Sequence, residues 1–249
     1  MVYDITGKKI TESSFSIMTS VMQNLSECRL RNAKLSGGTS SNEIYAAVAC
    51  CIEQYHLRGS VLDFGAGRGE LTLQLFHMGR FSKIVGVDIL ERPVNLPETV
   101  QWLNADLNDS LSGCGDKTFN MVLMVETIEH LENPRASFRE AYRLLQPGGT
   151  LILTTPNNES GRSLISLLVR GHYVAFNENC YPAHITALLR KDIERISLET
   201  GFLKPVFHYT NFGGIPGMPY ISWQSASHRI LKGLRFSDNL LAVCQRAAI

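Results

Sequence analysis

The chain has 249 residues, of which 44% are hydrophobic and 19% are charged, and its formal net charge is +1. This length supports one large domain with a sizeable core and argues against two full domains. No apolar run approaches the roughly 18 residues that cross a bilayer, and the N-terminus has no continuous apolar signal core, so neither a membrane span nor export is expected.

The charge is distributed unevenly along the chain. From Ser160 onward ten Lys/Arg stand against five Asp/Glu, so this part carries +5 and residues 1–159 carry −4. The bias would suit an anionic substrate, although scattered, solvated surface charge explains it as well. The six cysteines form no CxxC pair, which predicts reduced thiols and a cytoplasmic location.

An N-terminal helical cap is expected over residues 1–56. Residues 1–40 end in the Gly/Ser-rich break "SGGTSS", and from Ser41 to His56 apolar residues recur at helical spacing. Residues 1–40 could cover a cofactor or form a homodimer contact, and the sequence leaves both open. The rest of the chain, residues 57–249, is expected to form the main domain.

A regular alternation of strands and helices begins after residue 57. The strands are short and almost wholly apolar, and amphipathic helices separate them, which predicts a doubly wound α/β fold with a mostly parallel sheet covered on both faces. We expect strands at residues 61–64, 84–87, 100–103, 119–125 and 151–154, two more at 205–211 and 240–244, and helices at 71–78, from Pro134 to the Gly148–Gly149 pair, and at 191–200.

A long insertion, residues 157–189, follows the fifth predicted strand. Insertions at this point lie at the carboxyl edge of the sheet, where doubly wound folds bind their ligands. We therefore expect it to form a lid over the substrate. Within it, "SLISLLVRG" is the only candidate for a membrane-binding amphipathic helix, and it is short.

The segment "VLDFGAGRGE" connects the first strand to a helix. Gly65, Gly67 and Gly69 allow a sharp turn and the close approach of a ligand, and the helix start behind them offers free backbone N–H groups. Glu70 stands where a dinucleotide motif requires its third glycine, and no GK[ST] follows. The loop is therefore neither a G-x-G-x-x-G site nor a P-loop.

Two aspartates follow the next two strands and complete a nucleoside site. Asp88 ends the second strand and can accept hydrogen bonds from both hydroxyls of a ribose. Asp106 follows the third strand, in a position to meet an adenine amino group. Together with the glycine loop, these acids favour an adenosine that carries no phosphate.

The segments "VLDFGAGRGELTLQL", "GVDI", "NADL", "FNMVLMVETIEHLENP" and "LLQPGGTLILTTPN" resemble, in order and spacing, the motifs of class I S-adenosylmethionine-dependent methyltransferases. The resemblance covers about residues 60–156. It implies a Rossmann-like sheet of seven strands, the last one antiparallel, and S-adenosylmethionine as the cofactor. The implied cofactor-binding set is Asp63, Gly65, Ala66 and Gly67 at the methionine part, Asp88 at the ribose, Asp106 and Leu107 at the adenine, and in addition Ile89 and Glu126.

Two carboxylates and an imidazole follow the fourth strand, in "ETIEH". In a helical turn Glu126, Glu129 and His130 would share one face, and they could hold Mg²⁺ or Mn²⁺ while leaving sites for substrate oxygens. The motif is similar to the E-x-x-E-H signature of ubiquinone-biosynthesis O-methyltransferases and of small-RNA 2′-O-methyltransferases. The second branch implies His184 as a further ligand, with His172 as a weaker substitute.

The same residues have two alternatives to metal binding. Glu129, His130 and His184 could act as a general base or orient the substrate without a metal, and a purely structural role is the third interpretation.

The expected activity is O-methylation of a hydroxyl on a sugar, a glycan precursor or a similar small metabolite. One alternative is a metal-dependent 2′-O-methyltransferase that acts on RNA 3′ ends. No basic segment is dense enough to follow a phosphate backbone, which disfavours nucleic acid as a partner. The other alternative is a protein that binds S-adenosylmethionine without catalysis.

Overall fold

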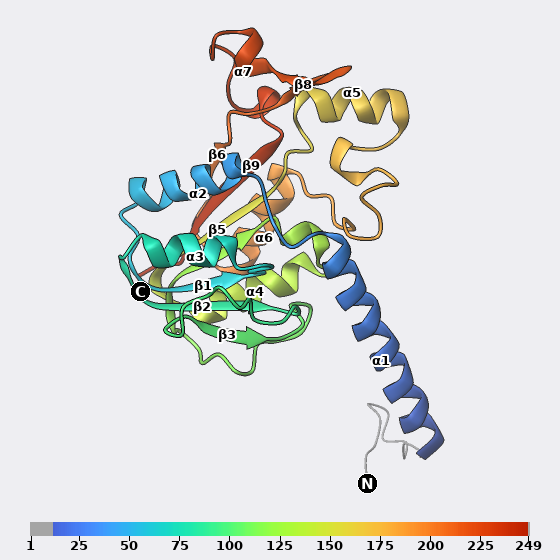
Figure 1. Ribbon diagram of the computed structural model, residues 1–249, viewed down its shortest axis with the longest axis vertical. Coiled ribbons are helices and arrows are strands. Elements are labelled where there is room, and N and C mark those ends of the chain that lie inside the picture. The colour runs from blue at the N-terminus through green and yellow to red at the C-terminus, as the bar shows by residue number, and fades with distance from the viewer. Residues whose placement is uncertain (1–11, 249) are drawn as a thin grey trace.

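The computed structural model describes residues 12–248, and Figure 1 shows a twisted central sheet with helices packed on both faces. The seven strands lie in the order β3-β2-β1-β4-β5-β9-β6. The first five strands are parallel, and β9 is antiparallel to β5 and to β6. The predicted Rossmann-like sheet with an antiparallel last strand is confirmed. The strands are β1 (Gly59–Phe64), β2 (Phe81–Asp88), β3 (Gln101–Asn104), β4 (Phe119–Val125), β5 (Leu145–Pro156), β6 (Val206–Tyr209) and β9 (Asn239–Gln245).

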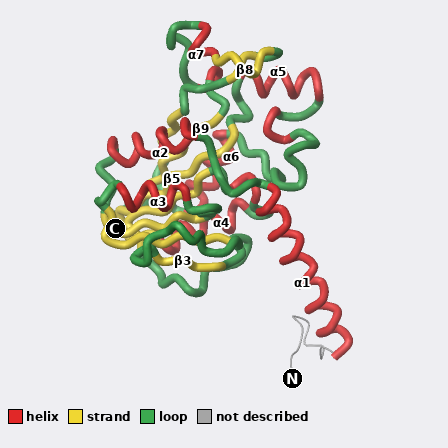
Figure 2. The backbone as a smooth tube through the Cα atoms, viewed as in Figure 1, coloured by secondary structure: helices red, strands yellow, loops and turns green. Residues whose placement is uncertain are grey.

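Helices cover both faces of this sheet, as Figure 2 shows in red on yellow. Successive residues of a strand point to opposite faces, so alternate positions of β4 belong to different buried clusters. On one face, the helix residues Val48 and Leu75 belong to the same buried cluster as Met121 of β4. On the other face, the helix residues Phe138 and Ile193 belong to the second cluster. The helices concerned are α2 (Asn42–Gln54) and α3 (Glu70–His77) on the first face, and α4 (Pro134–Leu144) and α6 (Arg190–Thr200) on the second.

The predicted starts of two helices are confirmed in atomic detail. The Asn133 side chain accepts a hydrogen bond from the backbone N–H of Ala136, with Pro134 at the first helical position, and the Ser41 side chain accepts one from Ile44. The end of α4 differs from the prediction. The helix stops at Leu144 and β5 begins at the next residue, so the predicted strand 151–154 is the middle of a longer buried stretch, residues 149–156.

The predicted lid, residues 157–189, contains regular structure that the sequence analysis did not predict. The insertion contains α5 (Gly161–Arg170) and the short 3-10 helix η2 (Val174–Phe176). Further along, β7 (Gly214–Ile215) and β8 (Met218–Ser222) form a hairpin, followed by α7 (Trp223–Ala226) and η3 (Leu234–Phe236). The hairpin escaped prediction because its first strand has only two residues in a segment rich in glycine and proline.

The predicted N-terminal cap lies partly outside the described residues. The helix α1 (Glu12–Leu35) leaves the body of the molecule, and only its C-terminal end meets it, whereas α2 packs on the sheet (Figure 1). The boundary at residue 56 stays a prediction. Within residues 12–248, no helix combines the length and apolarity needed to cross a bilayer.

Candidate functional site

A cavity of about 570 Å³ lies at the carboxyl edge of the parallel strands. The ends of β1, β2 and β4 form its floor, and the last turns of α1 and the segment 38–45 form a wall. All the residues predicted to bind the cofactor or a metal line this one cavity: Asp63, Gly65, Ala66, Gly67, Asp88, Ile89, Asp106, Leu107, Glu126, Glu129, His130 and His184.

The backbone angles of the glycine loop are ones that residues other than glycine adopt only with strain. Gly65 and Gly67 have φ angles of 90° and 53°. A Cβ on Gly65 would meet Thr127 Oγ1 at 2.4 Å, and one on Gly67 would meet the Gly38 carbonyl oxygen at 2.2 Å. That carbonyl also accepts a hydrogen bond of 2.8 Å from Arg68 N–H. The "SGGTSS" break is therefore the second wall of the glycine loop, a role that its composition alone did not reveal.

Asp88 is held rigidly at the end of β2. Its Oδ2 accepts from Gly67 N–H at 2.8 Å and its Oδ1 accepts from Leu90 N–H at 2.9 Å. Burial raises the pKa of Asp88, while the backbone N–H groups that it accepts from oppose the shift. The carboxylate thus sets the shape of the glycine loop as well as facing the cavity.

Asp106 has a partner that the sequence did not indicate. Arg29 of α1 donates from Nη1 to Asp106 Oδ2 at 3.0 Å, and from Nε and Nη2 to Glu132 at 2.9 and 2.7 Å. The other Asp106 oxygen accepts from Asn108 N–H at 2.9 Å. Arg29 thereby fastens the end of α1 over the predicted adenine position and holds the Asp106 carboxylate in place.

Asp63 is the most deeply buried acid of the cofactor set. It is 1% exposed and accepts a hydrogen bond of 2.6 Å from Thr72 Oγ1. Burial raises its pKa from 3.8 to about 7, against the opposing effect of the Thr72 hydroxyl, and the nearby Asp88 charge adds to the increase. A cationic group in the cavity, such as the ammonium group of a methionine moiety, would favour the ionised form of Asp63.

Asp63→Asn should change how the stability of the cofactor-free protein depends on pH. Above pH 3.8 the unfolded chain loses the Asp63 proton, whereas the folded protein keeps it until about pH 7. The stabilising contribution of Asp63 is therefore complete below pH 3.8 and is lost as the pH rises from 3.8 to about 7. We expect the melting temperature of the variant, relative to that of the native chain, to increase from pH 5 to pH 8. If the difference between the two melting temperatures stays constant from pH 5 to pH 8, the assignment is wrong.

Glu129, His130 and His184 form a cluster at the cavity wall. One potential ligand atom from each lies within 4.8 Å of the others. The Glu129 carbonyl oxygen accepts hydrogen bonds of 2.9 Å from both Ile185 N–H and Thr186 N–H. These two bonds bring the segment with His184 against the 3-10 helix η1 (Ile128–His130), although the segments are far apart in sequence.

The two histidines present unprotonated nitrogens to the cluster. A carbonyl oxygen can only accept, so Nδ1 of His130 donates to Ala183 at 2.7 Å and Nδ1 of His184 donates to Ala175 at 2.6 Å. Each Nε2 is then free to accept a proton or bind a metal. Burial lowers the pKa of His130 to about 4 and also lowers that of His184, so both rings are neutral near pH 7.

The Glu129 carboxylate is buried without a hydrogen bond. Its exposed fraction is 0%, and neither oxygen has a hydrogen-bond partner among the described residues. Burial, together with the nearby Glu126 charge, raises its pKa well above the ordinary value. A buried carboxylate next to two imidazole nitrogens is a donor set that suits a divalent cation, which would provide the missing counter-charge.

Glu126 occupies a different position from the one predicted. Its φ is 50°, and the 3-10 helix begins only at Ile128, so the three motif residues do not share a helical face. Its oxygens accept hydrogen bonds of 2.8 Å from Thr154 Oγ1 and from Asn239 Nδ2, and burial raises its pKa to about 7. Glu126 therefore lies outside the Glu129–His130–His184 cluster, and its role at the cofactor stays a prediction.

Residues 37–203 match the model of the protein family described as "Methyltransferase domain". A ubiquinone biosynthesis O-methyltransferase of Xanthomonas oryzae pv. oryzae is 31% identical over 153 residues, which cover 52% of this chain and 60% of that protein. A mitochondrial protein of the same name from Dictyostelium discoideum is 28% identical over 131 residues, or 46% of this chain and 40% of that protein. The matched regions thus span about half the length of these relatives.

Solved structures share the fold at low sequence identity. A possible histamine N-methyltransferase from Thermotoga maritima has a TM-score of 0.59 at 20% identity, covering 82% of this chain and 88% of that one. A Burkholderia thailandensis N1-methyltransferase with bound S-adenosylhomocysteine has a TM-score of 0.54 at 18% identity, covering 83% and 79%. At this identity the likeness concerns the fold alone.

Proposed function

We propose that this chain, which belongs to the methyltransferase domain family and has the fold of class I S-adenosylmethionine-dependent methyltransferases, transfers a methyl group from S-adenosylmethionine to a hydroxyl oxygen. The acceptor is a sugar, a glycan precursor or a similar small metabolite. The observation that carries the proposal is the cluster of Glu129, His130 and His184, which lines the same cavity as Asp88 and the glycine loop. The cysteines that the structure describes are free thiols, which supports the cytoplasm as the place of reaction.

The chemistry required of the protein is alignment and removal of a proton. A methyl group on a sulfonium is already activated, so the residues around it mainly orient the hydroxyl for in-line transfer. An alcohol is a weak nucleophile until its proton leaves, which explains the need for a basic group in the cavity. The neutral Nε2 of His130 or His184 can accept that proton at pH 7, because burial keeps both rings unprotonated.

Glu129, His130 and His184 would also hold Mg²⁺ or Mn²⁺. Such an ion lowers the pKa of a hydroxyl group and compensates the buried Glu129 carboxylate. In that case the two carbonyl-bonded Nδ1 atoms fix the rings, and the protein's contribution is a preformed set of donors. Two neighbouring hydroxyls would then suit the site better than one.

An RNA 3′-terminal ribose is the second candidate acceptor. It is supported by the position of His184, which joins Glu129 and His130 as the resemblance to small-RNA 2′-O-methyltransferases implies. A ribose at an RNA end presents the same pair of neighbouring hydroxyls as a sugar diol.

The test is a panel of acceptors with production of S-adenosylhomocysteine as the readout. Catechols, free sugars, sugar nucleotides and short RNAs with a 2′,3′-diol are incubated with S-adenosylmethionine, with and without Mn²⁺. We expect turnover with a diol-bearing small molecule, and none when the same molecule carries a single hydroxyl. Turnover confined to RNA would favour the second candidate, and cofactor binding without product from any acceptor would overturn both.

A further inference from the structure

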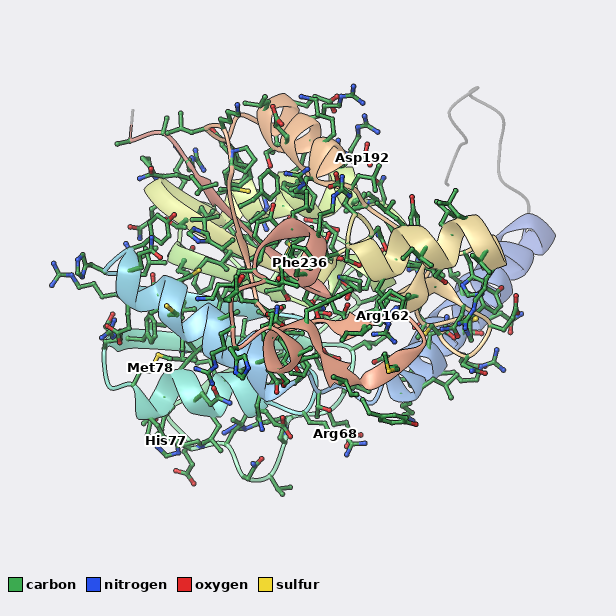
Figure 3. All side chains as sticks on the ribbon, turned by 90° about the horizontal axis from the view of Figure 1, so that it is seen from above. Arg68, His77, Met78, Arg162, Asp192 and Phe236 are labelled. Carbon is green, nitrogen blue, oxygen red and sulfur yellow. The ribbon has the colours of Figure 1, made fainter. Side chains whose placement is uncertain are left out.

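The helix α1 is held to the rest of the chain by polar bonds rather than by apolar packing. No described residue of α1 belongs to either of the two buried clusters. Figure 1 and Figure 3, which differ by a turn of 90°, both show the helix, in blue, projecting from the body of the molecule. Only its last turns reach the cavity, where Arg29, Asn32 and Ala33 are lining residues. The end of α1 is therefore a wall of the cavity that no hydrophobic core fixes in place.

One side chain fastens this wall to the body. Arg29 donates to Asp106 at 3.0 Å and, from two nitrogens, to the Glu132 carboxylate at 2.9 and 2.7 Å. We name these three hydrogen bonds the Arg29 latch. The side chains of Arg29 and Asp106 are 18% and 14% exposed, whereas that of Glu132 is 45% exposed. Among the side chains of α1 that the structure describes, Arg29 is the one that bonds to another element.

A pair of glycines follows α1 and can serve as its hinge. Gly37 and Gly38 have φ angles of 82° and 63°, and a Cβ on Gly37 would have no atom within 4 Å. Gly38 is fixed, because its carbonyl oxygen accepts a hydrogen bond of 2.8 Å from Arg68 N–H. Gly37 has open space around it, and glycine changes its backbone angles more readily than other residues. The helix can therefore turn about Gly37 while Gly38 keeps its place beside the glycine loop.

We propose that Arg29 is a positioning residue for the cofactor. The Arg29 latch holds α1 closed over the position predicted for the adenine, and its opening sets the rates at which S-adenosylmethionine enters and S-adenosylhomocysteine leaves. All three partners of the latch are protein groups, so the latch needs no ligand and restrains entry as well as release. The inference rests on the proposed use of S-adenosylmethionine, and it is independent of the acceptor.

A gate and a fixed wall of the site differ in their binding kinetics. If α1 must swing away before the ligand passes, a weaker latch raises the association and dissociation rates by the same factor, and the dissociation constant stays nearly unchanged. If Arg29 only stabilises the bound ligand, its loss raises the dissociation rate alone and weakens binding by the same factor. The two rates measured together therefore separate the two roles.

Surface plasmon resonance with the immobilised chain and S-adenosylhomocysteine measures both rates. Glu132→Gln removes the charge that receives two of the three bonds and leaves Asp106 in place. We expect both rates to rise about fivefold in this variant, while the dissociation constant stays within about twofold of the native value. Arg29→Gln removes the whole latch and should raise both rates about tenfold or more. Arg135→Ala, which breaks the exposed ion pair of Arg135 with Glu199, is the matched control and should keep the native rates.

A salt series on the native chain tests the latch without any variant. S-adenosylhomocysteine carries no net charge near pH 7, so salt acts mainly on the ionic bonds of the protein. As NaCl increases from about 50 mM to about 500 mM, the native rates should rise toward those of Arg29→Gln, and the rates of Arg29→Gln should change little. This measurement also decides the matter if a variant melts at too low a temperature to be assayed.

Three results would overturn the latch alone. The first is a native chain that binds S-adenosylhomocysteine at rates that neither the variants nor salt change. The second is faster dissociation in both variants with unchanged association, which would make Arg29 a fixed contact of the site. The third is an equal acceleration in Arg135→Ala. A native chain that does not bind S-adenosylhomocysteine at all would overturn the proposed function together with the latch.

Discussion

Replacing Asp88 by alanine is expected to weaken the binding of S-adenosylmethionine by about 100-fold or more while leaving a folded protein. The Asp88 carboxylate accepts from Gly67 N–H and Leu90 N–H, so its removal releases the glycine loop as well as the predicted ribose contact. The hydrogen bonds predicted from the two ribose hydroxyls to the charged Asp88 carboxylate would contribute about 1.5–3 kcal/mol each, so their loss corresponds to an increase in the dissociation constant of about 100-fold or more. Titration calorimetry with S-adenosylmethionine or S-adenosylhomocysteine measures it directly.

The comparison with His130→Ala gives this experiment its specificity. His130 lines the same cavity but belongs to the Glu129–His130–His184 cluster, which is expected to serve the acceptor. Its removal should therefore change cofactor affinity by less than about threefold, a difference of under 1 kcal/mol. Asp88→Asn should bind with intermediate affinity, because an amide keeps one oxygen that can accept. If both alanine variants bind the cofactor like the native chain, the assignment of the cofactor site is wrong.

The cofactor half of the site was predictable because its acids lie at or just beyond the carboxyl ends of parallel strands. Asp63 and Asp88 are among the last two residues of β1 and β2, and Asp106 follows β3 by two residues. Apolar runs mark the strands, and parallel strands end at one edge, so Asp63, Asp88 and Asp106 must come together there. The positive φ angles of Gly65 and Gly67 follow from the same local pattern. These features depend on residues that are neighbours in sequence, which is why a sequence pattern reveals them.

The other half depends on contacts that no local pattern encodes. Arg29 meets residues 77 and 103 positions away, and its helix carries no recognisable motif. His184 reaches the cluster only because the backbone of Ile185 and Thr186 bonds to Glu129. The helical interpretation of "ETIEH" failed for a local reason that propensity does not report, namely the left-handed backbone of Glu126. Spacing in sequence predicts a shared face only where the helix continues.

The helix α5 shows the same limit, because it buries Ser163 and Ser166 while Leu168 and Val169 are exposed. Its sequence has an amphipathic pattern, and a pattern alone cannot tell which face meets the protein. Ser163 is buried, and its hydroxyl accepts a hydrogen bond of 3.3 Å from Val174 N–H in the following turn. Tertiary structure therefore decides that the aliphatic side faces outward.

Glu129→Gln and His130→Ala should each lower kcat by about 100-fold to 1,000-fold with little change in cofactor affinity, because a positioned base typically contributes 10² to 10⁴ in rate. For Glu129→Gln, the amide also removes the only negative charge of the Glu129–His130–His184 cluster, so binding of Mn²⁺ to the protein should be lost. Titration with Mn²⁺, in which paramagnetic resonance measures the free ion, reports the binding of Mn²⁺ independently of turnover. His172→Ala is the matched control, since His172 bonds to the adjacent Tyr173 carbonyl outside the cavity lining.

Chelation separates the two uses of the cluster. If Glu129, His130 and His184 hold a divalent ion, prolonged treatment with a chelator should remove the activity of the native chain, and Mg²⁺ or Mn²⁺ should restore it. If the histidines act as bases without a metal, activity survives chelation, although His130→Ala remains slow. Activity that survives both chelation and the loss of His130 would show that the cluster takes no part in the reaction. The buried Glu129 side chain would then be protonated, which its raised pKa already favours.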